Sequence, residues 1–147
     1  HVHTRRLIQD SEGAGRYRGA NAIEVEFGPV DCRMEAGFVA DGKVHVPQGA
    51  RSGLASKPSE QLKRLRNGEL EILEQCSIVW VEDGETLVSV AQGGGGYGDP
   101  STRDIDRVAH DVNEKLISRA RAEEVYKVSV DEAGKVDKER TSLLRST

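Results

Sequence analysis

The chain has few aromatic residues, few histidines and no long apolar run. Phe, Trp and Tyr make up 4% of its 147 residues, and there are four histidines. No apolar stretch approaches the ~20 residues that a membrane-spanning helix needs, and no apolar signal segment follows the charged start at His1–Arg6. We therefore predict a cytoplasmic protein with no membrane partner and a core of aliphatic side chains.

The chain also lacks an excess of positive charge. Its formal net charge is -4 and its pI is near 5.6, whereas a nucleic-acid-binding domain carries a basic patch or stripe. Lysine and arginine are interleaved with aspartate and glutamate along the chain, as on an ordinary solvated surface. Nucleic acid is therefore not an expected partner.

Cysteine is scarce, and neither cysteine belongs to a CxxC motif. Cys32 and Cys76 are predicted to be reduced, buried thiols, as is usual for a cytoplasmic protein. A disulfide between them stays open as an alternative, because the spacing of two cysteines does not decide their pairing.

Catalytic and metal-binding patterns are missing as well. The chain has no Ser-His-Asp order, no HExxH and no Gly-Lys-Ser/Thr, and its carboxylates are scattered rather than paired. The nearest approach to a zinc set is Cys32, His45 and Cys76, or His1 and His3, and these lack ligand pairs at fixed spacing. His110 is interpreted as a surface or packing residue. We predict no catalytic, cofactor-binding or metal site here, and hence a subunit that supports chemistry housed elsewhere.

The first 91 residues have the pattern of antiparallel strands. Between residues 22 and 27, apolar and acidic residues alternate, which predicts a half-buried strand. A hairpin is predicted over 37–46 with its turn at Asp41-Gly42, because Asp-Gly between β-branched runs is a strong hairpin signal. Another is predicted over 77–91, turning at 82–85.

Residues 61–74 are ambiguous. Their leucines suit an amphipathic helix, but Asn67-Gly68 in the middle suits a two-residue type I′ turn between strands. We favour the hairpin. The preceding residues, 47–58, are rich in proline, glycine and small side chains and are predicted to be a loop.

After Pro100 the pattern becomes helical. The predicted helix caps are Ser101 or Thr102 for the first helix, Ser118 for a second that ends near Val125, and Asp137 for a last one. The apolar residues of the first helix recur at helical spacing, and they are Ile105, Val108, Ala109, Val112 and Leu116. Residues 126–130 are predicted to be a strand, with a turn at Gly134.

These elements predict an α+β fold that is rich in β-structure. Antiparallel strands and hairpins would form a barrel-like or sandwich arrangement, followed by a glycine-rich extended segment and two or three short C-terminal helices. We predict a single domain over 1–147, mainly β over 1–91, with a glycine-rich junction over 92–100 and a mainly helical tail over 101–147.

The most informative segment is the glycine run at that junction, Gln92–Pro100. Glycine costs more backbone entropy to order than any other residue, so four in succession suit a place where backbone approaches backbone or ligand closely. Gly93, Gly95 and Gly98 also fit G-x-G-x-x-G, but a dinucleotide site needs a parallel βαβ unit with an acidic residue ~20 positions later. Because the surrounding pattern is antiparallel and then helical, a nucleotide cradle is the less favoured alternative.

Two motifs resemble the C-terminal part of the hydantoinase B / 5-oxoprolinase family. One is Gly-Ala-Gly-Arg-Tyr-Arg-Gly-Ala over 13–20, before a strand. The other is Gly-Gly-Gly-Gly-Tyr-Gly-Asp-Pro over 93–100, followed by Arg103-Asp104 and by Val-Ala-His-Asp-Val over 108–112. The family usually has Gly-Leu-x-Gly-Gly-Lys-Pro where this chain departs from it, at 53–58.

The resemblance assigns a structural or interface role to both motifs. Their residues are Arg16, Tyr17, Arg18, Gly19, Gly93, Gly94, Gly95, Gly96, Tyr97, Gly98, Asp99 and Pro100. The glycines would let extended segments pack at short separation, in the manner of polyproline-II-like strands. Arg16 and Arg18 would pair with carboxylates of a partner or stack on aromatic rings.

The resemblance also implies a function within a complex. The chain is similar to small subunits of multisubunit, ATP-dependent, C–C-bond-forming ligases of the acetophenone carboxylase type, which convert acetophenone, bicarbonate and ATP to benzoylacetate. ATP and a divalent cation such as Mg²⁺ would then be held by large carboxylase- or hydantoinase-like subunits in a hetero-oligomer, with this chain as an accessory part. The alternatives are a subunit of a hydantoinase, oxoprolinase or acetone carboxylase complex, a stand-alone β-rich binding module, and an enzyme in its own right.

Overall fold

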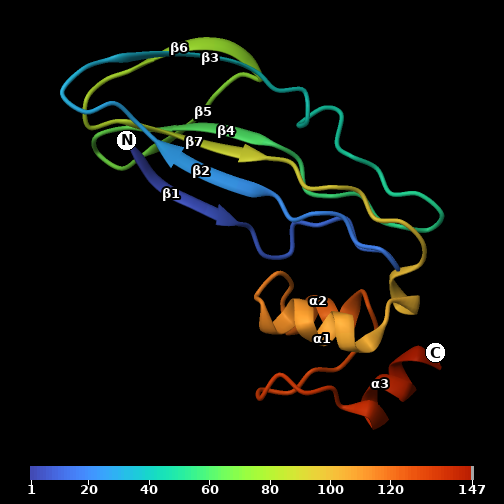
Figure 1. The fold of residues 1–147 in the computed structure, drawn as a ribbon. Helices are drawn as coiled ribbons and strands as arrows, with labels where there is room; N and C mark the ends of the chain where they lie inside the picture. The colour runs from blue at the N-terminus through green and yellow to red at the C-terminus, as the bar shows by residue number, and fades with distance from the viewer. Residues whose placement is uncertain (147) are drawn as a thin grey trace.

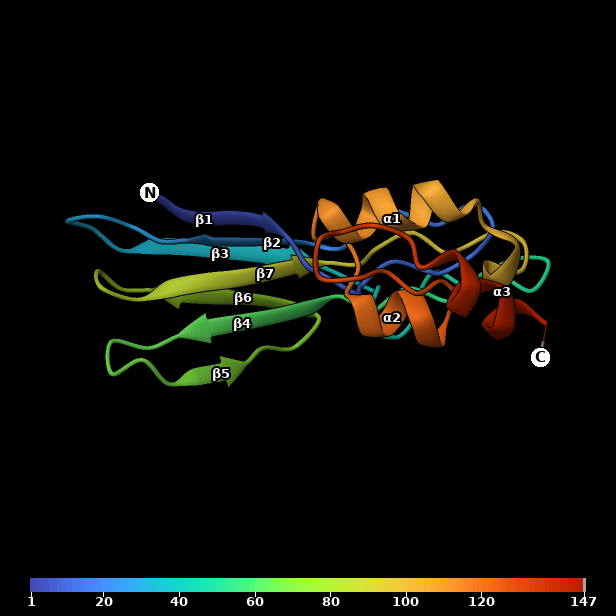
Figure 2. The ribbon, with the colours of Figure 1, turned by 90° about the horizontal axis from the view of Figure 1, so that it is seen from below.

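The computed structural model describes residues 1–146, with strands at one end of the molecule and helices at the other (Figures 1 and 2). Long extended segments run from the strands into the helical half. The strands are β1 (Val2–Leu7), β2 (Ile23–Phe27), β3 (Met34–Val39), β4 (Glu60–Arg64), β5 (Leu70–Ile72), β6 (Cys76–Val81) and β7 (Thr86–Ala91). They are followed by the 3₁₀ turn η1 (Pro100–Thr102) and the helices α1 (Ile105–Asn113), α2 (Arg119–Glu124) and α3 (Lys138–Arg145).

The strands form two stacked sheets. The larger has the order β1-β2-β7-β4-β5, the smaller pairs β3 with β6, and every pairing is antiparallel. Figure 1 shows the β3–β6 sheet lying over the larger one. Between them is a small core of Leu73, Val81 and Leu87, with Phe27 and Phe38 packed against it. The predicted β-rich α+β class is confirmed, and the arrangement is an open two-layer one rather than a closed barrel.

Two predicted hairpins are wrong, because their strands pair with partners that are distant in sequence. β3 pairs with β6 rather than with residues 43–46, which lie in a turn where Asp41 accepts from the amides of Val44 and His45. The turn at 82–85 does form, but it connects β6 in the small sheet to β7 in the large one. The pairing of β3 with β6 places their alternate apolar side chains on the larger sheet, which a local hairpin would not do.

The hairpin about Asn67-Gly68 is confirmed, but its turn differs from the prediction. β4 pairs with β5, with Leu62 opposite Ile72. Only Gly68 of the turn pair has a positive φ, at 88°, whereas a type I′ turn requires positive φ at both central residues. The left-handed position is therefore confined to the residue that adopts it without strain.

The helix starts are confirmed in two of three cases. Ser118 and Asp137 cap α2 and α3, but α1 is capped by Asp104, because Pro100–Thr102 forms a separate 3₁₀ turn. The predicted strand over 126–130 is reduced to one bridge, between Val130 and Val136. β1 lacks apolar alternation, so it was not predicted; it pairs with β2 at the edge of the sheet.

The helical half has its own core. Val108, Ile117, Ala122, Tyr126 and Val128 are all fully buried. Ala14, from the extended segment after β1, belongs to the same cluster. The helices therefore pack on the extended segments rather than on the strands.

The cysteines differ from the prediction of buried thiols. Cys32 and Cys76 are both free and exposed. No helix among residues 1–146 combines the length and the apolar composition that crossing a bilayer requires.

Candidate functional site

The two glycine-containing motifs lie against each other and enclose a third segment. We call residues 11–20, 48–54 and 93–98 the glycine bundle. Its segments are joined by backbone hydrogen bonds, in which the Gly13 amide donates to Gly94 at 2.8 Å and the Leu54 amide donates to Ala14 at 2.7 Å. The bundle runs between the strands and the helices, so it holds the two halves of the molecule together.

Most glycines of the bundle leave no room for a side chain. A Cβ atom on Gly13 would lie 2.5 Å from the Gly96 nitrogen, and one on Gly93 would lie 2.6 Å from the carbonyl oxygen of Ala20. At Gly19 and at Gly96 the overlap with backbone of the neighbouring segment is more severe. Close backbone approach is thus the physical reason for these glycines.

The bundle does not fit a nucleotide phosphate. The amides of Gly94, Gly96 and Gly98 donate to the carbonyls of Ala20, Leu54 and Ala50, each at 2.9 Å. A phosphate-binding loop needs such amides pointing at the ligand. Here they are used within the chain, and the space above the glycines is filled by the chain's own backbone.

Tyr17 and Tyr97 form an aromatic pair at the end of the bundle. They exchange backbone hydrogen bonds of 3.0 and 2.9 Å, and their ring centroids are 6.4 Å apart. The guanidinium of Arg16 lies over the Tyr17 ring and that of Arg51 over the Tyr97 ring, at 5.8 and 5.6 Å from the centroids. Both rings are exposed, so this motif pair presents cations stacked on aromatic rings to the surface.

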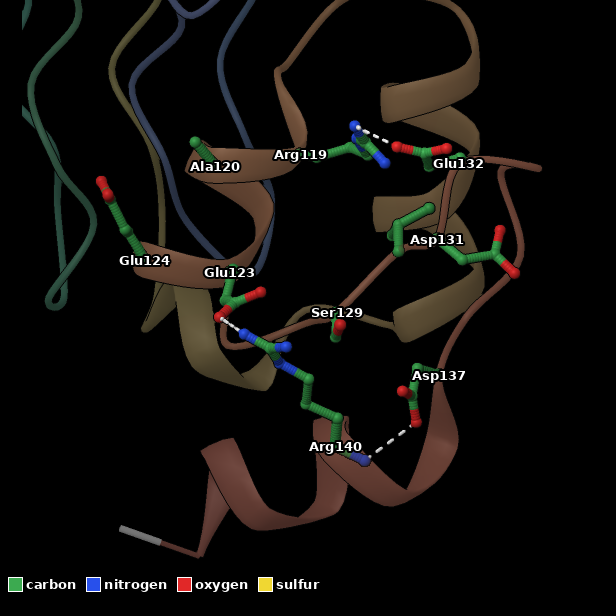
Figure 3. Close-up of a pocket in the computed structure, with 10 residues that line it drawn as sticks. Arg119, Ala120, Glu123, Glu124, Ser129, Asp131, Glu132, Asp137 and Arg140 are labelled. Atoms are coloured by element: carbon green, nitrogen blue, oxygen red, sulfur yellow. Dashed lines mark hydrogen bonds and ion pairs between the residues drawn. The ribbon is translucent and has the colours of Figure 1, made fainter.

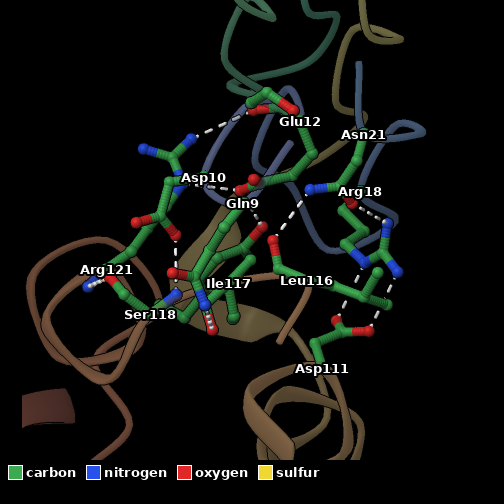
Figure 4. A network of polar contacts seen from close by, with 12 residues as sticks. Gln9, Asp10, Glu12, Arg18, Asn21, Asp111, Leu116, Ile117, Ser118 and Arg121 are labelled. Carbon is green, nitrogen blue, oxygen red and sulfur yellow. Dashed lines mark hydrogen bonds and ion pairs between the residues drawn. The ribbon is translucent and has the colours of Figure 1, made fainter. Parts of the chain in front are cut away.

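Arg18 points inward and pairs within the chain. Its guanidinium makes two hydrogen bonds to Asp111 of α1, at 2.9 and 3.0 Å (Figure 4). Arg103 donates to the same carboxylate at 2.9 Å and to the carbonyl of Arg16 at 3.1 Å. Asp111 and Arg103 are both buried. One carboxylate thus fixes the first motif and the entry to α1 in place.

A second buried carboxylate, Glu12, joins the bundle to α2. Arg121 donates to its side chain at 2.6 Å, and the Tyr126 hydroxyl donates to the same oxygen at 2.9 Å. Burial, with the neighbouring charge of Glu12, raises the pKa of Tyr126 far above its usual value. The tyrosine therefore stays neutral and acts as a hydrogen-bond donor.

The segment after β1 is clamped to the turn between α1 and α2. Asp10 accepts a hydrogen bond of 2.6 Å from the Ser118 amide, and the Asn21 amide group donates to Ile8 and Leu116 at 2.9 and 2.7 Å (Figure 4). These hydrogen bonds position the segment after β1 against the turn between α1 and α2.

Asp99 and Pro100 end the glycine run. Asp99 accepts from both the amide and the hydroxyl of Ser101, each at 2.8 Å, and these bonds hold the pKa of Asp99 below its ordinary value. Pro100 is buried at the start of η1. The pair directs the chain out of the bundle towards α1.

A hollow of about 620 Å³ lies between α2, α3 and the connecting loop (Figure 3). Its charged groups largely neutralise one another, since Arg140 pairs with Glu123 and Arg119 lies 3.7 Å from Glu132. Asp137 caps the backbone of α3. This hollow is a polar surface cleft with no nucleophile–base pair.

Within residues 1–146, no three His, Cys, Asp or Glu side chains lie close enough to hold a metal ion. Cys32, His45 and Cys76 therefore do not come together.

The structure thus gathers the predicted motif residues at one place, and it adds partners that sequence reasoning missed. Glu12 and Arg121 were not singled out, and Asp111 was noted only as part of the motif over 108–112, because the pairs Arg18–Asp111 and Arg121–Glu12 join residues about a hundred positions apart. The one local signal was Asp111, an acid beside the apolar stripe of α1, which calls for a buried cation. The third bundle segment, 48–54, was predicted only as a loop.

Known proteins have sequences similar to this chain. The chain is 31% identical to the beta subunit of caprolactamase from Pseudomonas jessenii, over 99% of its own length and 26% of that protein. It is 32% identical to an uncharacterized protein of Methanocaldococcus jannaschii, over 95% of its own length and 25% of that protein. The chain thus spans about a quarter of the length of these relatives.

Solved structures have the same fold. The ATP-dependent caprolactamase of Pseudomonas jessenii matches 99% of this chain and 26% of its own, with a TM-score of 0.79 and 27% identity. Nucleotide-free acetone carboxylase matches 99% of this chain and 24% of its own, with a TM-score of 0.77 and 21% identity.

The first two thirds of the sequence identify the family. They contain the strands, the Arg16–Gly19 motif and the glycine run. Residues 1–100 match the family described as Hydantoinase B/oxoprolinase. This chain therefore belongs to the hydantoinase B/oxoprolinase family.

Proposed function

We propose that this chain is an accessory, structural part of an ATP-dependent enzyme complex, in which it completes a large hydantoinase-B-like subunit. The observation that carries the proposal is that buried carboxylates at the glycine bundle, Asp111 and Glu12, are paired with arginines of this chain and hold the fold together; nearly the whole chain, 99%, corresponds to 26% of the ATP-dependent caprolactamase chain. Chemistry in such an assembly would reside in the remaining regions. The ion pairs at the glycine bundle support this division, because Arg18 pairs with Asp111 and Arg121 pairs with Glu12 within the chain.

The exposed face of the β3–β6 sheet supports the need for a partner. Val39 and Ile78 lie on this outer face with 85% and 69% of their surfaces exposed, and Trp80 is beside them. Within the described residues each of the two strands pairs only with the other. An apolar face with open strand edges is typical of a surface that a partner covers.

We assign ATP, with a divalent cation such as Mg²⁺, to a partner region, since the amides of Gly94, Gly96 and Gly98 are occupied by this chain's own carbonyls. The complex would be cytoplasmic. The reaction has two candidates. Similarity to caprolactamase favours ATP-dependent opening of a cyclic amide. The resemblance of the chain to the small subunit of acetophenone carboxylase favours carboxylation of a ketone of that type.

The test is substrate-dependent ATP hydrolysis by the assembly recovered through a tag on this chain. Caprolactam, hydantoin, and acetophenone with bicarbonate are supplied in turn, beside the isolated 147-residue chain. We expect one substrate class to stimulate ATP hydrolysis by the assembly, and no turnover by the chain alone. Turnover by the isolated chain would refute an accessory role, and an assembly without ATP hydrolysis would refute membership of an ATP-dependent complex.

A further inference from the structure

A separate, partly enclosed pocket lies where the sheet meets the extended segments. It has a volume of about 310 Å³ and lies against β2, β7 and β4 where these strands adjoin the glycine bundle. Residues just after β1 and just before β4 complete its wall. Nothing in the proposed function uses this pocket, and its size is within the range of small-molecule sites.

Most of the wall is apolar. Leu62, Val88 and Val90 come from adjacent strands, and Ile8 and Pro58 come from the flanking segments. Removal of apolar surface from water is favourable in proportion to the area removed. The pocket therefore favours a ligand with an aliphatic portion.

The charged side chains that line the pocket are two lysines and two glutamates, and one of the glutamates is already paired outside the pocket. Lys43 and Lys57 line it and are exposed, and neither makes an ion pair within the described residues. Glu24 is already held by two hydrogen bonds from Arg6, at 2.7 and 3.0 Å. Among the lining residues, Glu60 is then the one remaining carboxylate, whereas Lys43 and Lys57 provide two ammonium groups. The balance favours an anionic head group on the ligand.

A buried hydroxyl in the wall has no partner. Ser59 is 2% exposed, and its Oγ makes no hydrogen bond within the part of the chain that is described. Buried polar atoms are nearly always hydrogen-bonded, so each exception needs an explanation. A ligand oxygen in the pocket would accept the hydrogen bond that Ser59 leaves unused.

We propose that this pocket binds a short-chain aliphatic carboxylate. The aliphatic tail lies against Leu62, Val88 and Val90. The carboxylate meets the ammonium groups of Lys43 and Lys57, whose aliphatic stems extend the apolar wall, and accepts from the Ser59 hydroxyl.

The test is an NMR titration of the isotope-labelled 147-residue chain with hexanoate, acetate and hexylamine. Hexanoate should shift the amide signals of residues around the pocket. Acetate lacks the tail and hexylamine carries the wrong charge, so both should bind much more weakly. Lys57→Gln should weaken hexanoate binding about fivefold, the effect of one exposed ion pair, and Lys138→Gln on α3 should leave it unchanged. Ser59→Ala should weaken binding about threefold while keeping the midpoint of urea unfolding, since the hydroxyl has no partner in the fold.

Three results would overturn the proposal. Equal shifts with acetate would mean that lysines attract any anion. Equal binding of hexylamine would mean an apolar pocket without charge selection. Hexanoate binding that is lost on assembly with the large subunits would mean that a partner's segment fills the pocket instead. The measurements on the isolated chain do not depend on the proposed enzyme complex.

Discussion

The helical half and the strand half of the molecule bury their side chains to different degrees. In the helical half, Val108, Ile117 and Tyr126 are fully buried, and they pack against the extended segments of the glycine bundle. In the strand half, Val39 is 85% exposed and Ile78 is 69% exposed. The comparison teaches that the helices and the bundle contain the larger buried core, whereas the strands present an apolar face that a partner would cover.

The polar contacts of the two halves differ in the same way. The pairs Arg18–Asp111 and Arg121–Glu12 are at least partly buried and join segments far apart in sequence. The pair Arg6–Glu24 in the sheet is largely exposed on its arginine side. Exposed pairs contribute at most ~1 kcal/mol, whereas breaking a buried pair is costly. Stability should therefore depend mainly on the bundle and the helices.

The largest effect is expected from a side chain added inside the bundle. Gly96→Ala places a carbon against the carbonyl of Ala14, and neither backbone segment can yield without breaking hydrogen bonds. We expect a loss of more than ~4 kcal/mol in the free energy of unfolding, measured by urea denaturation. The control is Gly37→Ala in β3, where the added carbon would be 3.7 Å from Ile78 and the change should be within ~1 kcal/mol. Similar losses for both variants would contradict a special role of the bundle.

Gly95→Val applies the same test to assembly. Its side chain would meet the backbone of Gln48, so we expect the variant to fail to join large subunits in co-purification. A Gly95→Val variant that assembles normally but has lost turnover would assign the glycine run to catalysis and refute the structural role.

A somewhat smaller effect is expected from Asp111→Asn. The substitution leaves the guanidinium groups of Arg18 and Arg103 without their shared carboxylate, and we expect a loss of about 3 kcal/mol. The loss is measured by urea unfolding, with Trp80 fluorescence as the probe of the strand half and far-ultraviolet circular dichroism as the probe of the helices. The same two probes test the prediction that residues 1–147 form one domain, which requires both signals to change at the same urea concentration. The control Glu132→Gln, at an exposed pair, should change stability by less than ~0.5 kcal/mol.

The fold could be predicted from the sequence where short-range physics decides it. The alternation over 22–27 and the capping residues Ser118 and Asp137 act within a few positions, and all three predictions are confirmed. The pairing of β3 with β6 and the separation of β6 from β7 depend on which apolar faces meet across the sandwich. No local pattern contains that information.

The candidate site, like the fold, could be predicted from the sequence only in part. The glycine run indicated close backbone approach, but it did not indicate that residues 48–54 would fill the space beside it. Arg18 was expected to face a partner or an aromatic ring, and it instead meets Asp111, 93 positions along the chain. Contacts of that range are set by the packed fold and not by spacing.

A moderate effect is expected from Tyr126→Phe. Loss of the hydroxyl removes a hydrogen bond to the buried Glu12 carboxylate and should cost about 1–2 kcal/mol at neutral pH. Because burial, with Glu12, raises the pKa of Tyr126, its contribution is present below the unfolded value of about 10 and is lost as pH rises above it. As the pH rises above ~10, the free energy of unfolding should therefore fall less for Tyr126→Phe than for the native chain. An unchanged alkaline profile would contradict this, and Tyr17→Phe, at an exposed ring, serves as the control.

The smallest effect on stability is expected on the exposed face. Val39→Thr replaces an apolar group by a polar one of similar shape where the side chain is 85% exposed, so stability should change by less than ~0.5 kcal/mol. The same substitution at the fully buried Val108 should cost at least ~1–3 kcal/mol. Val39→Thr should nevertheless weaken binding to large subunits, measured by co-purification. Unimpaired binding would remove this face from the proposed interface.

The most direct test of the account is native mass spectrometry of the protein isolated from its own source through a tag on this chain. The account predicts an assembly that contains a hydantoinase-B-like region together with ATP-dependent subunits, held with this chain at fixed stoichiometry. Recovery of a lone 16.0 kDa monomer would contradict it, and the shared fold would then reflect ancestry without a shared role.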